Sequence, residues 1–124
     1  MSPSRVVRCT DSELVEEPAN SLSLRQLVTA SAHGPDISVT WVQLAGRHRR
    51  LRTDRSTRVY VVLAGALTFR IGSELPAGVE SGDLVVIPPG LSYELSGAAA
   101  YLVVNAPAFV EGDDVYLADR SADE

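Results

Sequence analysis

The sequence predicts an all-β fold in which short antiparallel strands form a sandwich or barrel. Its apolar stretches are short, and several alternate with polar residues as half-buried strands do. Glycine and proline separate these stretches at regular intervals, and no apolar stripe of helical period occurs between residues 30 and 110. The length of 124 residues and the hydrophobic content of 45% suit one domain with one core.

Residues 1–30 are expected to form an N-terminal extension with one strand. Their acidic start favours a short helix or turn near residues 10–17, and leucines at nearly alternating positions favour a strand near 21–30. The sequence His33-Gly-Pro-Asp36 is typical of a turn before the next element.

The barrel itself is expected over residues 31–110, followed by an acidic C-terminal tail over 111–124. Ala64-Gly65-Ala66 stands between two apolar stretches, which predicts a hairpin there. The barrel strands are predicted at residues 37–44, 60–63, 68–71, 84–87, 93–95 and 101–104.

The charge distribution argues against nucleic acid as a partner. The formal net charge is −5, and all 11 basic residues are arginines. A dense arginine cluster can bind nucleic acid, but the acidic remainder of this chain would repel a polyanion. A solvated arginine loop and a site for a small anionic ligand remain as the two interpretations. The clustered arginines are Arg47, Arg49, Arg50, Arg52, Arg55 and Arg58.

We expect a cytoplasmic protein without a membrane segment. No apolar run approaches the roughly 18–20 residues that span a bilayer. The first residues lack the apolar core of a secretory leader, and Cys9, the single cysteine, cannot form an internal disulfide. The absence of lysine beside many arginines and alanines is typical of a bacterial source of high GC content.

Two glycine-containing stretches resemble the motifs of the cupin superfamily, which read G-x5-H-x-H-x3-4-E-x6-G and G-x5-P-x-G-x2-H-x3-N. The resemblance covers residues 40–105 and implies a double-stranded β-helix, a jelly-roll barrel with an internal cavity. It also implies pairing as a homodimer. The chain keeps the backbone-shaping residues of both motifs at the family spacing: Gly65, Gly82, Pro88 and Gly90.

The metal-binding half of these motifs is missing. The glutamate slot holds Arg58, and the histidine slot of the second motif holds Tyr93. A guanidinium offers no lone pair and therefore cannot ligate a metal. The resemblance thus implies a cupin without metal or other cofactor, although an atypical site of His48, Asp54 and Tyr93 stays open. The slots of the histidine pair fall on Arg52 and Asp54 or, with the longer gap, on Leu51 and Thr53.

The resemblance also suggests a ligand pocket around Arg58. Facing inward, its guanidinium would offer a bidentate fork to a carboxylate or phosphate, with Arg52 as a second cation. Tyr60 shares its strand face with Arg58, and Trp41 and Gln43 share a face on the strand 37–44, so these residues are candidate cavity walls. Each is alternatively a structural residue: Trp41 and Tyr60 in the core, Arg58 in an ion pair.

Catalysis would need a proton donor and a base near a group that stabilises negative charge. Tyr93 or Tyr60 is the candidate donor. Arg58, with Arg52 as a second cation, is the candidate stabiliser, and His48 or Asp54 is the candidate base. Arginines around Asp54 would make its carboxylate a weak base.

The hypothesis favoured by these residues is a metal-independent isomerase, epimerase, cyclase or lyase. It would act on an anionic or carbonyl-containing small molecule in bacterial biosynthesis. Two alternatives remain: a non-catalytic protein that binds an anionic metabolite, and a structural or partner subunit whose cavity is filled by side chains.

Overall fold

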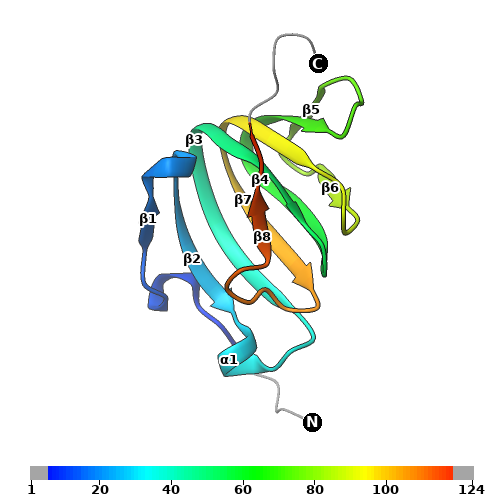
Figure 1. Ribbon diagram of the computed structural model, residues 1–124. Helices are drawn as coiled ribbons and strands as arrows, with labels where there is room; N and C mark the ends of the chain where they lie inside the picture. Colours follow the sequence, from blue (N-terminus) through cyan, green and yellow to red (C-terminus); the bar gives the residue numbers. More distant parts are fainter. Residues whose placement is uncertain (1–5, 119–124) are drawn as a thin grey trace.

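A computed structural model describes residues 6–118 and shows one antiparallel sheet of eight strands (Figure 1). Hydrogen-bonded neighbours follow the order β1-β2-β3-β7-β4-β5, with β6 paired to β4 and β8 paired to β3. The sheet curves around its core but does not close. The strands are β1 (Val15–Glu17), β2 (Leu22–Val28), β3 (Ser38–Thr53), β4 (Thr57–Ile71), β5 (Ala77–Glu80), β6 (Leu84–Ile87), β7 (Tyr93–Ala106) and β8 (Asp114–Tyr116).

Three short helical segments connect or precede these strands. They are the 3-10 turns η1 (Cys9–Asp11) and η2 (Pro18–Asn20) and the helix α1 (Ala30–His33). The hydroxyl of Thr29 accepts a hydrogen bond from the Ala32 amide and so caps the start of α1. Among the described residues, no helix has the length and apolar character needed to cross a membrane.

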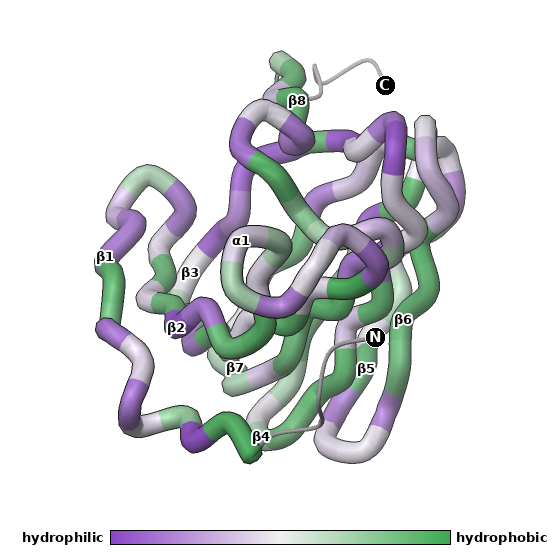
Figure 2. The backbone as a smooth tube through the Cα atoms, turned by 90° about the horizontal axis from the view of Figure 1, so that it is seen from below, coloured by the Kyte–Doolittle hydropathy of each residue, from purple (hydrophilic) through white to green (hydrophobic). Residues whose placement is uncertain are grey.

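The long strands β3, β7 and β4 form the centre of the sheet and carry its core. Tyr101 of β7 lies opposite Val42 of β3 on one side and Val62 of β4 on the other, and all three side chains are buried. Figure 2 shows hydrophobic stretches along β4 and β6. Aromatic rings fill much of the interior, in contacts that join Tyr60 to Phe69, Tyr93 and Tyr101.

Glycine is required at residue 65, where β4 approaches its neighbour β7 closely. Its φ is +82°, and a Cβ added there would lie 2.2 Å from the carbonyl oxygen of Ala98. A bulge between Val62 and Ala64 bends β4 at this point. The predicted hairpin at Ala64-Gly65-Ala66 is therefore wrong: the chain bends there and continues as one strand.

Other element boundaries also differ from the predictions. The first thirty residues contain two strands, β1 and β2, and a three-residue turn replaces the helix expected near residues 10–17. The strands predicted at 93–95 and 101–104 are one continuous strand, β7. The acidic tail holds β8, which pairs with the end of β3, and residues 119–124 lie outside the described part of the chain.

Candidate active site

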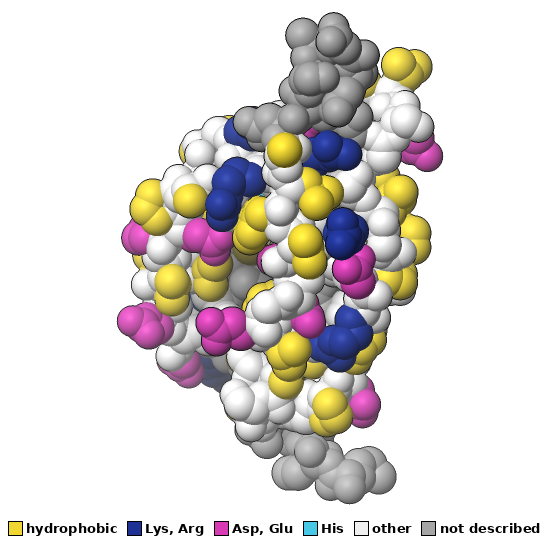
Figure 3. Space-filling model, viewed as in Figure 1, with side chains coloured by type: hydrophobic (Ala, Val, Ile, Leu, Met, Phe, Trp, Pro, Cys, Tyr) yellow, Lys and Arg dark blue, Asp and Glu magenta, His cyan; other side chains and the backbone are white. Residues whose placement is uncertain are grey.

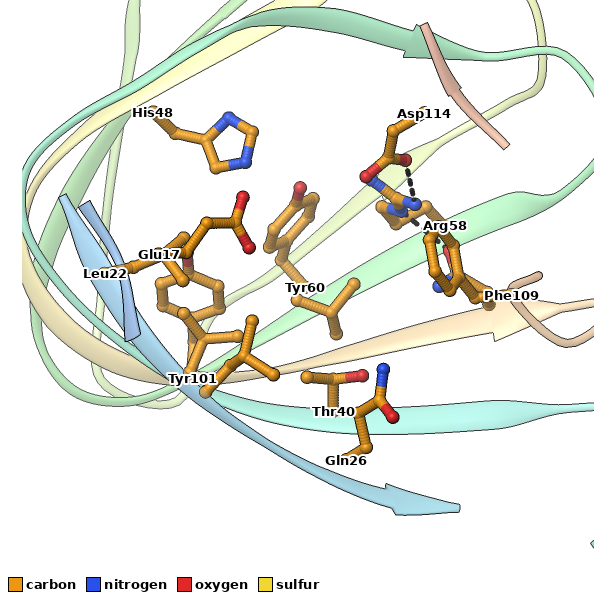
Figure 4. Close-up of a pocket in the computed structure, with 14 residues that line it drawn as sticks. Glu17, Leu22, Gln26, Thr40, His48, Arg58, Tyr60, Tyr101, Phe109 and Asp114 are labelled. Carbon is orange, nitrogen blue, oxygen red and sulfur yellow. Dashed lines mark hydrogen bonds and ion pairs between the residues drawn. The ribbon is translucent and has the colours of Figure 1, made fainter. Parts of the chain in front are cut away.

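A cavity of about 160 Å³ lies between the inner faces of β2, β3, β4 and β7 (Figure 4). Tyr60 and Tyr101 belong to the aromatic core and also line this cavity, so the cavity borders the core directly. Because strand side chains alternate between faces, every second residue of these strands reaches the lining. The polar and aromatic lining residues are Glu17, Gln26, Thr40, His48, Arg58, Tyr60, Tyr101, Asn105, Phe109 and Asp114.

Arg58 is the buried cation of this site, and all three of its guanidinium nitrogens are engaged. Nε donates to Oδ1 of Asn105 at 2.7 Å, Nη1 to the hydroxyl of Tyr93 at 2.9 Å, and Nη2 to Oδ1 of Asp114 at 2.7 Å. Burial opposes the charge, but Tyr93, Tyr60 and Asp114 outweigh it and raise the pKa of Arg58. The guanidinium is therefore charged, and each of its three nitrogens already has a partner within the protein.

The Arg58 contacts set the direction of a hydrogen-bonded relay. Arginine only donates, so the Tyr93 oxygen accepts from it. The hydroxyls of Tyr93 and Tyr60 lie 2.7 Å apart, and Tyr60 is the remaining partner for the Tyr93 proton among the described residues. The Tyr60 oxygen then accepts, and its own proton is left for the cavity that Tyr60 lines.

Both phenols stay protonated near neutral pH. Burial raises the pKa of Tyr60, partly opposed by the charge of Arg58. Burial also raises the pKa of Tyr93 well above its usual value. Tyr60 therefore presents an O–H donor to the cavity, polarised through Tyr93 by a fixed positive charge.

His48 supplies a neutral imidazole at the other side of the cavity. Its Nδ1 lies 2.8 Å from the carbonyl oxygen of Arg49, which can only accept, so Nδ1 carries a proton. Burial lowers the pKa of His48, although the Arg49 contact opposes this shift. The neutral ring therefore keeps a lone pair on Nε2, and Figure 4 shows the ring on the same cavity as Tyr60.

Glu17 adds a carboxylate that the sequence reasoning missed. It points into the cavity near His48 (Figure 4). The fully buried Asn20 donates its side-chain amide to Glu17 and, at 3.1 Å, to the hydroxyl of Tyr116. Its carbonyl oxygen accepts from the backbone N–H of Arg49 at 3.0 Å. The Glu17 carboxylate is thus held in place by β3 and β8 together.

The cavity has one more negative than positive charge when His48 is neutral. Arg58 is positive, whereas Glu17 and Asp114 are carboxylates. A negatively charged group on a ligand would be repelled by these carboxylates, because the cation in the lining, Arg58, is already paired with Asp114. This charge count favours a neutral, hydroxyl-bearing ligand, and the expectation of an anionic ligand stays an untested prediction.

Four of the predicted site residues lie away from the cavity. Arg52 and Asp54 form a surface ion pair at 2.8 Å, with 36% and 54% of their side chains exposed. Trp41 and Gln43 face the opposite side of β3, because their alternating neighbours Thr40 and Val42 line the cavity.

The other four predicted residues come together. Arg58, Tyr60 and His48 line the cavity, and Tyr93 lies directly behind Tyr60 with its side chain fully buried. Asn105 and Asp114 were missed. Asn105 follows Tyr101 and Val103 on the inward face of β7, so alternation could have identified it, whereas Asp114 reaches Arg58 only through the pairing of β8 with β3.

The residues at the metal slots do not fit a divalent cation. The guanidinium of Arg58 occupies the glutamate position, and Asp114 is bonded to it. Within residues 6–118, no three His, Cys, Asp or Glu side chains are grouped as a metal site would require. The atypical set of His48, Asp54 and Tyr93 is not assembled, because Asp54 lies at the surface.

The arginine-rich segment is largely neutralised by acidic residues from elsewhere in the chain. Arg47 pairs with Glu94 at 2.8 Å, and Arg55 pairs with Asp113 at 2.8 Å. Figure 3 shows basic and acidic side chains interspersed on one face of the protein. The arginine-rich segment therefore forms ion pairs with β7 and with the C-terminal part of the chain, and it does not form a continuous basic surface.

Comparison with solved structures identifies the architecture. The nucleoside dehydratase Pac13 superposes with a TM-score of 0.81 at 23% identity, over 98% of each chain. The chain has the cupin fold. KdgF from Halomonas also shares this cupin fold, with a TM-score of 0.75 at 16% identity over 86% of this chain and 96% of that one.

Larger cupin-fold proteins match as well. Oxalate decarboxylase from Bacillus subtilis superposes with a TM-score of 0.75 at 20% identity, over 93% of this chain but only 33% of that chain. No protein-family model and no curated protein sequence matches the chain. Structures of Streptomyces Pac13 with uridine include variants in which a histidine or either of two tyrosines is substituted.

Proposed function

We propose that this protein is a metal-independent lyase that removes water from a neutral, hydroxylated small molecule carrying an aldehyde or ketone. The observation that carries the proposal is the relay from Arg58 through Tyr93 to Tyr60, which opens on the same cavity as the neutral imidazole of His48. An O–H donor and a base that face the same cavity are the two groups that such an elimination needs.

Tyr60 is placed to bind the carbonyl oxygen of the substrate. Its O–H donates to that oxygen, and the donor strengthens as negative charge develops there, because Tyr93 and Arg58 stand behind it. The relay needs no movement at the moment of reaction, since its atoms are already within hydrogen-bonding distance. It therefore acts as an oxyanion-stabilising device in which Tyr60 touches the substrate and Tyr93 positions Tyr60.

His48 is placed to act as the base. Nε2 of the neutral ring takes the proton from the carbon next to the carbonyl, and the electrons of that C–H bond form an enolate held by Tyr60. The C–O bond of the neighbouring carbon then breaks, and the double bond forms between the two carbons. The proton on His48 passes to the departing hydroxyl, which leaves as water, and His48 is neutral again.

Glu17 and Asp114 fit a hydroxylated substrate. Carboxylates accept hydrogen bonds from hydroxyl groups, and Glu17 is fixed by Asn20 at the cavity wall. Asp114 is engaged by Arg58 and serves chiefly to balance its charge. Substrates with phosphate or carboxylate groups would meet a net negative lining and bind less well.

The comparison with Pac13 supports this assignment. The substituted residues of Pac13 follow one another in its chain in the order histidine, tyrosine, tyrosine, and so do His48, Tyr60 and Tyr93 here. Pac13 is a nucleoside dehydratase, so its reaction removes water. An isomerase or epimerase would share the first proton transfer and differ only in returning the proton to carbon. Pairing as a homodimer stays a prediction.

The test is proton exchange and dehydration on a panel of neutral hydroxy-aldehydes and hydroxy-ketones. In D2O, the protein should exchange the proton next to the carbonyl, followed by nuclear magnetic resonance, and mass spectrometry should show the loss of one water. His48→Gln should slow both by about 10²–10⁴-fold while the variant stays folded. Ligand binding with neither exchange nor dehydration would instead identify a non-catalytic binding protein.

A further inference from the structure

A second compartment, which the proposed reaction does not use, adjoins the cavity. This outer compartment, of about 540 Å³, lies between the end of β2, the start of α1 and the chain at Val110 and Glu111. Its wall shares Gln26, Thr40 and Phe109 with the inner cavity. The two compartments therefore adjoin, and these three side chains stand at their junction.

Two polar groups at the junction are unengaged. Gln26 and Thr40 are Cα partners in the β2–β3 register, and Figure 4 shows their side chains next to each other at the cavity. Among the described residues, neither side chain has a hydrogen-bond partner. By contrast, Thr29 accepts from the Ala32 amide and Ser38 from the Phe109 amide at 2.8 Å. The Gln26 amide and the Thr40 hydroxyl are thus the polar groups free to meet a ligand at this point.

Phe109 gives the junction an apolar wall. The Ser38 contact fixes its backbone, and the half-buried ring lines both compartments. Val28 and Val110 extend the apolar surface into the outer compartment. A flat ring can stack or pack against such a wall, while an edge with both donor and acceptor can pair with a carboxamide.

We propose that the junction binds a planar ring bearing a cyclic amide or imide edge, attached to the hydroxylated part of the substrate. The Gln26 carboxamide and the Thr40 hydroxyl bond the edge of the ring, and Phe109 contacts its face. The sugar-sized part then lies in the inner cavity beside His48 and Tyr60. This inference rests on the proposed function and adds that the substrate spans both compartments.

The experiment is calorimetric titration with three probes: uridine, methyl β-ribofuranoside, which lacks the ring, and 3-methyluridine, whose imide N–H is blocked. We expect the protein to bind uridine at least about tenfold more tightly than the riboside and more tightly than 3-methyluridine. Gln26→Ala should lower the affinity for uridine about tenfold and abolish the preference for uridine over 3-methyluridine. The affinity for the riboside should stay the same. Phe109→Leu should lower the affinities for uridine and 3-methyluridine by the same factor.

Gln43→Ala is the matched control, since Gln43 lies on the outer face of β3, and it should change none of the three affinities. Thermal melts of each variant check that it is folded. Equal affinities for uridine and the riboside, no binding of uridine, or an unchanged preference in folded Gln26→Ala would each overturn the inference. Proton exchange on ring-free hydroxy-aldehydes decides the proposed function separately, because that assay needs only the inner cavity.

Discussion

The hydroxyl oxygens of Tyr60 and Tyr93 lie 2.7 Å apart, yet only Tyr60 lines the cavity. Tyr93 is fully buried and accepts from Arg58, so it connects the cation to the residue that can touch a substrate. The two tyrosines therefore have different roles, which substitution can separate.

Tyr60→Phe should reduce kcat about 10²–10³-fold, because it removes the donor at the carbonyl oxygen. Tyr93→Phe should reduce kcat less and also destabilise the protein by about 1–3 kcal/mol, since it leaves Nη1 of the buried Arg58 without its partner. Steady-state kinetics and urea unfolding measure the two effects. The assignment would be contradicted if Tyr93→Phe impaired turnover more than Tyr60→Phe without loss of stability.

Activity should fall at acidic pH when His48 becomes protonated. Burial lowers the pKa of His48, so the fall should come below the usual value of about 6.5. The unfolded chain takes up this proton at higher pH than the folded one, so the His48 contribution to stability is present above about 6.5 and is lost as pH falls through the folded pKa. The turnover rate and the free energy of unfolding in urea, each measured against pH, test these two expectations. In His48→Gln the pH-dependent loss of unfolding free energy should be absent. A rate that fell only at alkaline pH would exclude His48 as the base.

Breaking the Arg58–Asp114 ion pair by replacing the arginine should destabilise the protein strongly. Arg58→Met leaves Asp114 and Asn105 without their donor inside the protein, and we expect a loss of about 3–5 kcal/mol of unfolding free energy. Adding Asp114→Asn to Arg58→Met should then cost less than Asp114→Asn costs alone, because the ion pair is already absent. Urea unfolding of the four proteins gives this coupling, and additive losses would show that the pair contributes nothing of its own.

Gly65 should tolerate no side chain. Gly65→Ala would place a Cβ 2.2 Å from the Ala98 carbonyl oxygen at a positive φ, so we expect a loss of more than about 3 kcal/mol or failure to fold. Gly78 is the matched control in the paired strand β5, because a Cβ there meets nothing within 4 Å. Gly78→Ala should therefore leave the melting temperature nearly unchanged. Similar melting temperatures for the two variants would refute the close-approach argument.

Chelation should change neither turnover nor thermal stability, because the charged guanidinium of Arg58 stands at the position of a ligand. The measurement compares protein treated with EDTA, and protein then supplied with Mn²⁺ or Zn²⁺, with untreated protein. Activity that disappears on chelation and returns with one metal would show that a metal takes part in the reaction.

Local spacing was enough to predict the fold and half of the site. Short spacings along the chain identify the turn residues and the two motif slots, because these features depend on local backbone geometry. The turn residues are Gly82, Pro88 and Gly90, and the slots hold Arg58 and Tyr93. Alternation showed that Trp41 and Gln43 share a face, but it could not show which face is inward, and that choice was wrong. The hairpin at Gly65 was also wrong, because one glycine serves a strand bend as well as a turn.

Glu17 and Asp114 could not be predicted by this reasoning. Each lies in an acidic stretch that has no local pattern of a site. Asp114 reaches the cavity through the pairing of β8 with the distant strand β3, whereas Glu17 lies on β1, which pairs with the next strand, β2. Their positions depend on Asn20, Tyr116 and Arg58, which lie far apart in sequence.

The pairing of β8 with the end of β3 has a consequence for biosynthesis of the protein. Arg58 and His48 leave the ribosome long before Asp114, so the nascent chain holds an arginine whose buried partner has not yet been made. Only after β8 has been translated can Arg58 pair with the carboxylate of Asp114 and Asn20 contact the hydroxyl of Tyr116. A chain terminated before that strand would therefore carry most of the barrel but lack Asp114 and Tyr116 at the cavity.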